Sequence, residues 1–231
     1  MTRPRIFSLI GILVLFVLVV GLIITRISFF NKTMYRVGEI PQEIANQLIP
    51  KVIPISSLRP PALRMIDPIR YGNATSLVSV IEYGDYECES CRDMKPIIES
   101  VIPKYKGKVR FVWRDMPNES QHKNALSTAV FARCAGLQGK YWETYDALMT
   151  RTTLGETEYR RIAAGLGLDD ALLRGCRNDP AAEASIKKDV EQARADGINS
   201  VPLTFIGASA YEGTLDEATL KQAIEKELSS L

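Results

Sequence analysis

The sequence predicts an α/β domain with an inserted helical lobe, preceded by an N-terminal transmembrane helix. Three observations support this fold class. Short β-rich runs alternate with segments of helical spacing between residues 77 and 228. A Cys-x-x-Cys motif at residues 88–91 stands where the first of these runs gives way to a helix. Residues 6–25 carry no charge, which is typical of a membrane span.

The composition is that of an ordinary globular protein, and it narrows the possible functions. Of the 231 residues, 46% are apolar and 24% are charged. The formal net charge is only +2, so no basic surplus indicates a nucleic-acid partner, and we expect none. A single histidine excludes a metal site built from several histidines, and we expect no metal ion.

Residues 1–26 are predicted to form a short cytoplasmic stub and an uncleaved transmembrane signal anchor. As a helix, the twenty residues 6–25 are about 30 Å long, enough to cross the hydrocarbon core. The stretch is longer than the apolar region of a secretory signal peptide, and no small-residue cleavage site follows it. Arg3 and Arg5 favour a cytoplasmic N-terminus, although three basic residues just beyond the helix weaken this bias. We therefore expect this helix to contact the lipid bilayer.

Residues 27–66 are predicted to be a proline-containing tether, and residues 67–231 the folded domain. Five prolines interrupt the tether, and no long apolar period survives between them. The charge divides near the same place, with a net +6 on residues 1–65 and a net −4 on residues 66–231. A basic arm before a mildly acidic domain indicates a position close to a membrane surface.

The domain is predicted to fold as β-α-β, then a helical insert at about residues 120–196, then β-β-α. The first strand covers residues 77–83, and a helix starts near Cys88 and runs toward Tyr105 with a kink at Pro96. The later elements are a strand at 108–113, helices at 125–137, 140–149, 156–165, 169–176 and 181–195, a strand at 201–206, a turn into a short strand at 207–213, and a helix at 215–228.

The Cys88–Cys91 motif carries the strongest chemical signal in the chain. Two residues between cysteines at a helix start bring both sulfur atoms within reach of a disulfide. Cys88 then lies at the helix N-terminus, where unpaired N–H groups and the helix dipole favour a thiolate. Cys91 lies one turn further in and is better shielded. The spacing therefore predicts redox chemistry with Cys88 as the nucleophile and Cys91 as the resolving thiol.

Two other uses of these cysteines stay open at this point. A structural zinc site needs four ligands, usually as two close pairs, whereas Cys134, Cys176 and His122 are scattered along the chain. A purely structural Cys88–Cys91 disulfide is the second alternative. The position between a strand and a helix favours redox use over both.

Two further positions are candidates for the reaction. Glu82 lies on the inward-facing alternation of the first strand, so we expect its carboxyl to be buried with a raised pKa; the alternative is a glutamate facing water. A buried carboxyl can take the proton from Cys91 when that thiol attacks a mixed disulfide. Val201 and Pro202 open the third strand. A cis bond between them would bring the Val201 backbone beside Cys88, to pair with a substrate peptide.

Together these residues resemble the DsbA-like branch of the thioredoxin superfamily over residues 67–231. The resemblance is carried by the strand, motif and helix around residues 77–91, by the Val201-Pro202 strand, by the inserted helices, and by local blocks at residues 72–74, 111–117, 134–142 and 197–202.

The resemblance implies a thioredoxin-like fold and an extracytoplasmic thiol–disulfide oxidoreductase. In this chain it implies a nucleophile at Cys88, a resolving thiol at Cys91, a buried acid at Glu82 and a cis-proline at Pro202. It also implies a single-pass protein of the bacterial inner membrane with the domain outside. No bound cofactor is expected, because the reaction moves electrons and protons between sulfur atoms. The residues expected to contact the substrate are Val201, Pro202, Glu89 and Ser90.

One departure from the family pattern concerns the residue after the first cysteine. Many members carry proline there, and this chain has Glu89. Four acidic residues crowd the motif, and like charge is expected to raise the pKa of Cys88 and make its disulfide less oxidising than that of DsbA. The Ser90 hydroxyl can offset this effect by donating a hydrogen bond to the sulfur. The acidic residues are Asp85, Glu87, Glu89 and Asp93.

The other cysteines, Cys134 and Cys176, both fall in the helical insert. In an oxidising compartment two leftover cysteines in one lobe usually pair, so we predict a structural disulfide; the alternative is two buried thiols. His122 is interpreted as a capping or packing residue, with tuning of the active site as the alternative. Trp113 and Trp142 are predicted to pack in the core.

The prediction for function is an oxidase that donates its Cys88–Cys91 disulfide to unfolded or reduced secreted proteins. A quinone-linked membrane redox partner would reoxidise it, and a shared membrane would raise the effective concentration of that partner. The alternative is a membrane-bound reductase or isomerase of the same fold, which the acidic Glu89 favours. A third interpretation, an anchored peptide-binding module, is disfavoured by the intact motif.

Overall fold

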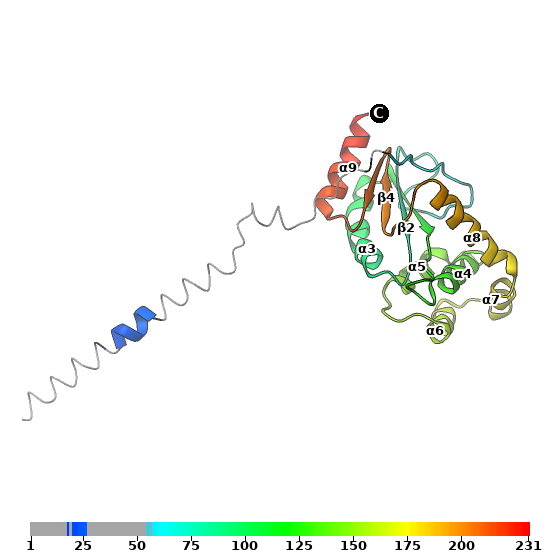
Figure 1. Cartoon of the computed structure of the whole chain (residues 1–231), viewed down its shortest axis with the longest axis horizontal. Coiled ribbons are helices and arrows are strands. Elements are labelled where there is room, and N and C mark those ends of the chain that lie inside the picture. Colours follow the sequence, from blue (N-terminus) through cyan, green and yellow to red (C-terminus); the bar gives the residue numbers. More distant parts are fainter. Residues whose placement is uncertain (1–17, 19, 27–54, 56) are drawn as a thin grey trace, which may run out of the picture. The chain divides into compact units, whose positions relative to one another are not determined.

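The computed structural model describes residues 18, 20–26, 55 and 57–231 (Figure 1). The chain divides into two compact units, Met1–Lys51 and Val52–Leu231. In the first unit, Leu18 and residues 20–26 are helical. Among the described residues no helix is both long and apolar enough to cross a bilayer. Most of the predicted transmembrane helix at 6–25, and most of the predicted tether at 27–66, lie outside the described residues.

A mixed sheet forms the centre of the Val52–Leu231 unit. Its strands are β1 (Ile69–Arg70), β2 (Val78–Gly84), β3 (Val109–Asp115), β4 (Leu203–Ile206) and β5 (Ser209–Glu212). They lie in the order β1-β3-β2-β4-β5, with β2 and β3 parallel and every other neighbouring pair antiparallel. β2 and β3 are buried along almost their whole length, as expected for strands covered on both faces.

Helices cover the sheet on two sides. The α-helices of this unit are α3 (Glu89–Val101), α4 (Ala125–Gly136), α5 (Tyr141–Met149), α6 (Glu156–Leu166), α7 (Asp170–Arg177), α8 (Pro180–Ala195) and α9 (Glu217–Ser229). In Figure 1, α3 and α9 lie side by side to the left of the sheet and α8 to its right, while α4, α5, α6 and α7 gather below it. The predicted helical insert is therefore the lobe formed by α4 to α8.

Aspartates mark where three of these helices begin. Asp169, Asp179 and Asp216 each accept a hydrogen bond from a backbone N–H in the first turn of α7, α8 and α9. Such caps satisfy N–H groups that have no partner inside the helix. Pro180 occupies the first position of α8, where its missing N–H costs nothing.

The predicted order of elements is confirmed, with two differences. β1 was not predicted because two residues carry no alternation to detect; it exists through pairing with β3, where Ile69 lies opposite Val112. The helix predicted to reach Tyr105 changes after Val101 into a 3₁₀ helix over Ile102–Tyr105. Pro103 lacks the N–H that an α-helix would need at that point.

The core beneath the sheet is rich in aromatic side chains. Trp113 of β3 packs on Tyr145 of α5 with ring centres 5.2 Å apart, and on Tyr86 at 5.1 Å. Trp142 packs on Phe111 at 5.7 Å. The prediction that both tryptophans serve packing is confirmed, and these contacts attach the helical lobe to the sheet.

The chain just before β1 contacts the domain. The Ile55 N–H donates to the carbonyl of Ala210 in β5 at 2.7 Å. The Arg64 guanidinium donates to Asp189 of α8 at 2.7 Å and to Asp67. Ile55 and Arg64, which fall in the predicted tether, therefore contact the rest of the Val52–Leu231 unit. The boundary predicted at residue 66 stays a prediction.

Candidate active site

Cys88 and Cys91 lie at the junction of β2 and α3. Cys88 is the N-cap of α3, and its sulfur accepts a hydrogen bond from the Cys91 backbone N–H at 3.3 Å. Cys91 lies in the first turn and is fully buried, whereas Cys88 retains 8% exposure. Both are free thiols in this structure. A sulfur at a helix N-terminus with a slightly open face is the arrangement expected of an attacking thiol.

The two thiols differ strongly in acidity. The pKa of Cys88 is lowered to about 7, mainly because the Cys91 thiol donates a hydrogen bond to it, an effect that burial partly opposes. The pKa of Cys91 is raised, first by burial and then by the Cys88 and Glu82 groups beside it. At neutral pH about half of Cys88 is therefore thiolate while Cys91 keeps its proton. The geometry fits the predicted roles of nucleophile and resolving thiol.

Glu82 lies in the middle of β2 beneath the motif, opposite Trp113 on one neighbouring strand and Thr204 on the other. Its side chain is fully buried, which the alternation predicted. Among the described residues neither carboxylate oxygen has a hydrogen-bond partner. Burial, followed by the charge of Cys88, raises the pKa of Glu82 well above its usual range. The predicted burial and raised pKa are thus found, and the role of Glu82 as a proton carrier stays a prediction.

Val201 and Pro202 lie at the same end of the sheet as the motif. β4 begins at Leu203, which pairs with Tyr83 near the end of β2, so the residues before β4 lie where the chain leaves β2 for α3. The Val201–Pro202 bond is cis. Pro202 is buried and its carbonyl accepts the Gly213 N–H at 2.8 Å. Val201 is half-buried, which leaves part of it available to a substrate chain.

Glu89 and Ser90, the residues between the cysteines, are exposed. The Ser90 carbonyl accepts the Thr214 hydroxyl at 3.3 Å, which ties the motif to the loop before α9. Within residues 57–231, the hydrogen bond to the Cys88 sulfur comes from the Cys91 backbone, and none is made by the Ser90 hydroxyl. Cys91, rather than the Ser90 hydroxyl, therefore donates the hydrogen bond that opposes the effect of the acidic residues on Cys88.

Two of the four acidic residues near the motif are structural. Glu87 accepts the backbone N–H and the side-chain amide of Asn124 at 2.8 and 2.9 Å. Asp85 is buried and accepts a hydrogen bond from Nδ1 of His122 at 2.8 Å. Asp85 raises the pKa of Cys88, as predicted for like charge, but the hydrogen bonds from Cys91 and the His122 charge outweigh it. The predicted unfavourable effect of like charge is therefore present at Asp85, and the balance of all these groups leaves the pKa of Cys88 at about 7.

The Asp85–His122 contact is the part of the site that sequence reasoning did not foresee. The two residues are 37 positions apart, and no spacing rule joins them. The only available signal was the presence of one histidine in a chain whose redox motif is surrounded by acidic residues.

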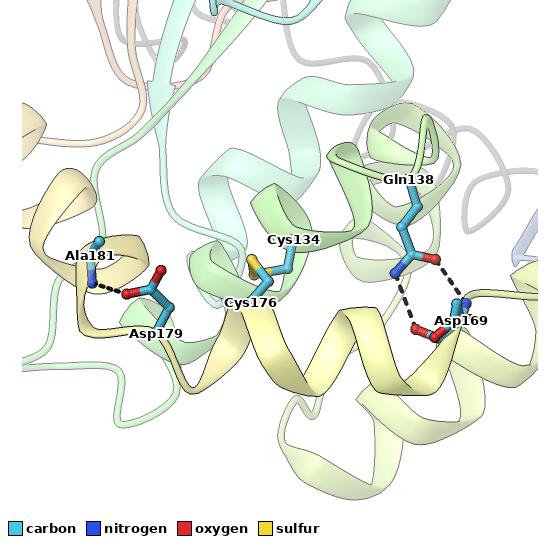
Figure 2. The surroundings of a disulfide bond; sticks show 6 residues. All are labelled: Cys134, Gln138, Asp169, Cys176, Asp179 and Ala181. Carbon is cyan, nitrogen blue, oxygen red and sulfur yellow. Dashed lines mark hydrogen bonds between the residues drawn. A yellow bond between two sulfur atoms is a disulfide. The ribbon is translucent and has the colours of Figure 1, made fainter.

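The predicted Cys134–Cys176 disulfide is present and joins α4 to α7 (Figure 2). Its Cα atoms are 5.7 Å apart. Figure 2 also shows Gln138 bridging to the backbone of Asp169, accepting its N–H at 2.8 Å and donating to its carbonyl at 3.2 Å. The end of α7 is thus fixed to α4 by the covalent bond, and the start of α7 is fixed to the residues just after α4 by two hydrogen bonds.

The part of the chain that the structure describes contains no cluster of three potential metal ligands. Cys88 and Cys91 lie together, while Cys134 and Cys176 are paired with each other.

Comparison with known proteins also indicates a thioredoxin-like oxidoreductase. A family model described as Thioredoxin (Thioredoxin_4) matches residues 65–226. The chain is similar to the crystal structure of a thioredoxin-like oxidoreductase from Silicibacter pomeroyi DSS-3, with 27% identity, a TM-score of 0.65, and coverage of 73% of this chain and 95% of that one. It shares its fold with the thiol–disulfide exchange protein α-DsbA2 from Wolbachia pipientis, at 23% identity, a TM-score of 0.63, and coverage of 70% and 87%.

The curated relatives that match this chain in sequence are named as Na(+)/H(+) antiporters rather than as oxidoreductases. The chain is 30% identical over 172 residues to Na(+)/H(+) antiporter NhaA 1 of Mycolicibacterium gilvum, a match that covers 71% of this chain and 27% of the antiporter. A protein named Na(+)/H(+) antiporter NhaA from Herminiimonas arsenicoxydans is 28% identical over 169 residues, or 73% of this chain and 27% of that protein. The chain therefore spans only about a quarter of the length of these relatives.

Proposed function

Because the chain belongs to the thioredoxin family and is a thiol–disulfide oxidoreductase, we propose that it transfers its Cys88–Cys91 disulfide to reduced secreted proteins outside the cytoplasm. The main observation behind this proposal is the difference in acidity and burial between Cys88 and Cys91. Cys88 is a good leaving group, with a pKa lowered to about 7, while Cys91 is buried and retains its proton. A disulfide between such thiols exposes one sulfur to attack and shields the other.

The reaction proceeds in two exchanges. A substrate thiolate attacks the Cys88 sulfur, the Cys88–Cys91 bond breaks, and a mixed disulfide forms. The departing Cys91 sulfur takes the proton held by Glu82, whose raised pKa keeps it protonated. A second substrate thiolate then attacks the substrate sulfur of the mixed disulfide and releases Cys88 as thiolate. The substrate loses two electrons, and the enzyme gains them as two reduced cysteines.

Val201 supplies the position at which the substrate chain is held. It lies at the end of the sheet where β4 begins, next to the junction that carries the motif. Its backbone groups precede the β4 ladder and can pair with an extended peptide, as strands accept an added strand at an open edge. Glu89 and Ser90 form the exposed rim on the other side of Cys88.

A reductase or isomerase role is the second candidate, and the acidity of Cys88 favours it. A thiol pKa near 7 is typical of thioredoxin, whereas that of DsbA is about 3.5. A less stable thiolate makes the disulfide less oxidising. In this direction Cys88 attacks a substrate disulfide, and Glu82, once ionised, accepts the proton from Cys91.

The reduction potential of the full chain in detergent decides between the two roles. The protein is equilibrated with glutathione buffers, quenched with acid, and the fraction of oxidised Cys88–Cys91 peptide is measured by mass spectrometry. A potential near about −120 mV supports the oxidase, and a value of about −200 mV or lower supports the reductase or isomerase. Absence of any exchange at Cys88 would contradict both roles.

We also propose that residues 1–26 anchor the domain to the bacterial inner membrane, with the domain on the outer side. The uncharged residues 6–25 and the basic arm support this proposal. So does the similarity to proteins named as antiporters, in which a region resembling this domain is part of a membrane protein. A quinone-linked partner in the same membrane would reoxidise Cys88–Cys91.

The anchor is tested on intact cells. Extraction with alkaline carbonate is expected to leave the full chain with the membrane, and a variant lacking residues 1–26 in the soluble fraction. A membrane-impermeant maleimide is expected to label reduced Cys88 without cell lysis. Release of the full chain by carbonate, or labelling only after lysis, would contradict the proposal.

A further inference from the structure

His122 is connected to the redox motif through a buried carboxylate. The Asp85 side chain is 1% exposed and accepts Nδ1 of His122 at 2.8 Å. The Asp85 carbonyl accepts the backbone N–H of Cys88 at 3.1 Å, so the same residue holds both the imidazole and the first cysteine. His122 keeps about a quarter of its side chain exposed, and it can exchange protons with water.

The position of His122 is fixed by more than this one contact. Asp85 also accepts the backbone N–H of Asn118 at 2.9 Å and that of Glu87 at 2.8 Å. Glu87 in turn holds Asn124 through two hydrogen bonds. The loop between β3 and α4 is therefore held at both ends by the carboxylates of Asp85 and Glu87, which precede the motif. These contacts fix the place of the imidazole next to Asp85 in the reduced protein.

The titratable groups around Cys88 differ in whether they favour a thiolate there. The titratable groups that act on it are Cys91 of α3, Glu82 of β2, Asp85 of the preceding loop and His122. The first three are neutral or negative, and the motif itself contributes Glu89 and no basic residue. Asp85 disfavours a thiolate at Cys88, whereas the hydrogen bonds from Cys91 and, more weakly, the positive charge on His122 favour it. Protonated His122 forms a neutral pair with Asp85 and so cancels the nearest negative charge.

We propose that His122, oriented by Asp85, is the positioning residue whose charge stabilises the Cys88 thiolate and thereby sets the reduction potential of the Cys88–Cys91 disulfide. The disulfide form carries no charge at Cys88, so a cation beside it stabilises the reduced enzyme more than the oxidised enzyme. The pair makes the enzyme more oxidising than its acidic surroundings alone would allow. This inference rests on the proposed thiol–disulfide exchange but holds for either direction of electron flow.

The first test uses the fact that the chain contains one histidine. Imidazole proton signals of the full chain in detergent, prepared without a histidine tag, report on His122 alone. If the charge stabilises the thiolate, the thiolate must stabilise the charge by the same factor. We expect the ring signals to respond to pH at a higher value in the reduced protein than in the oxidised protein. Equal midpoints in the two redox states would overturn the proposal.

The second test removes the charge. In His122→Gln the pKa of Cys88, measured by thiolate absorbance or by the pH profile of alkylation, is expected to rise by about one unit. At pH 7, where about half of wild-type Cys88 is thiolate, the equilibrium constant with glutathione is expected to shift about twofold toward the disulfide, which corresponds to about 9 mV for a two-electron couple. Lys123→Gln is the matched control, because Lys123 is exposed, adjacent and equally charged, and it is expected to change neither value.

Two further variants separate charge from packing. His122→Lys keeps a positive charge and is expected to restore most of the Cys88 acidity lost in His122→Gln. Asp85→Asn removes the carboxylate that orients the imidazole, so adding His122→Gln to this variant is expected to change the pKa of Cys88 less than His122→Gln does alone. If this variant fails to fold, the His122 variants and the ring titration still decide the question.

The outcomes also separate this inference from the proposed function. A wild-type potential of about −200 mV or lower contradicts the oxidase but leaves the His122 effect measurable. A wild-type potential near that of DsbA with His122→Gln indistinguishable from Lys123→Gln supports the oxidase and overturns the inference.

Discussion

Glu82 is a carboxyl placed among apolar side chains with no partner among the described residues. Its pKa is raised by burial, so the folded chain binds this proton more tightly than the unfolded chain, whose value is near 4.5. The stabilisation from this proton is fully present below about pH 4.5, and it is lost as the pH rises from there through the folded-state pKa. The proposed proton transfer to and from Cys91 would account for an unfavourable group in the core.

We expect Glu82→Gln to slow exchange on the order of 10²-fold, because Cys91 loses its proton donor and acceptor. The same variant should become more stable relative to the wild type as the pH rises above about 4.5, since the glutamine has no proton to lose. Urea unfolding at several pH values and stopped-flow exchange with a model thiol measure the two effects. A pH-independent stability difference between the proteins would contradict the assignment.

Cys91 is the residue expected to resolve a mixed disulfide when Cys88 has attacked a substrate disulfide. In Cys91→Ser, Cys88 can attack a substrate disulfide, but no resolving thiol remains to release the mixed disulfide. We expect covalent complexes with substrate proteins to accumulate through Cys88 and to disappear on reduction. Non-reducing gels and mass spectrometry identify them. Cys88→Ser is the matched control, and equal trapping by both variants would show that Cys88 is not the attacking thiol.

At this scale the sequence was most informative where chemistry is local. Cys88, Cys91 and the burial of Glu82 follow from a four-residue motif and from alternation along one strand, and the structure agrees with both. Asp85 and His122 meet only because the chain returns after β3, so no local pattern could predict their contact. The sequence indicated the unfavourable effect of acidic charge on the Cys88 thiolate, but it did not show that hydrogen bonds from Cys91 would outweigh this effect.

The helices α4 and α7 show how a covalent bond stabilises one part of the fold. The Cys134–Cys176 disulfide spans 42 residues of sequence. In the chain-entropy description a loop of this length contributes about 3–4 kcal/mol by restricting the unfolded chain. Cys134 is fully buried, whereas Cys176 lies at the edge of the core.

We expect the double variant Cys134→Ala, Cys176→Ala to lose about 3–4 kcal/mol of unfolding free energy while exchange at Cys88 keeps its rate. Chemical denaturation and insulin reduction at a temperature well below unfolding measure these two properties. Loss of exchange in protein that is still folded would indicate that the lobe disulfide takes part in the reaction.

Elements were predicted reliably where they are long and periodic. The helices of the lobe and the strands β2, β3 and β4 carry clear patterns of apolar residues. β1 and the 3₁₀ helix escaped prediction, because two residues hold no period and because the change of helix type depends on where Pro103 falls. Both differences concern the ends of longer elements or the edge of the sheet, and neither alters the position of the motif.

Across the whole domain, an ion-pair network joins three parts that are distant in sequence. Asp189 of α8 accepts from Arg64 before β1 at 2.7 Å and from Arg133 of α4 at 2.8 Å. Arg133 also donates to Asp115 at the end of β3 at 2.7 Å. The segment before β1, the sheet and the lobe therefore share one set of half-buried charges.

We expect Asp189→Ala to destabilise the domain by about 1–3 kcal/mol, since two guanidinium groups lose a partner. Lys187→Ala, which removes an exposed charge two residues away on the same helix, is expected to have no measurable effect. Thermal unfolding of the full chain compares them. Equal stability of the two variants would show that the network contributes nothing beyond surface charge.

The lobe disulfide also means that each copy of this enzyme must itself be oxidised as it folds. Closing Cys134–Cys176 removes two electrons and two protons from the newly made chain, so some acceptor must take them before the lobe reaches its full stability. A copy that stays in a reducing compartment lacks this bond and unfolds more readily. The abundance of mature enzyme is thereby coupled to the oxidising capacity of the place where it matures.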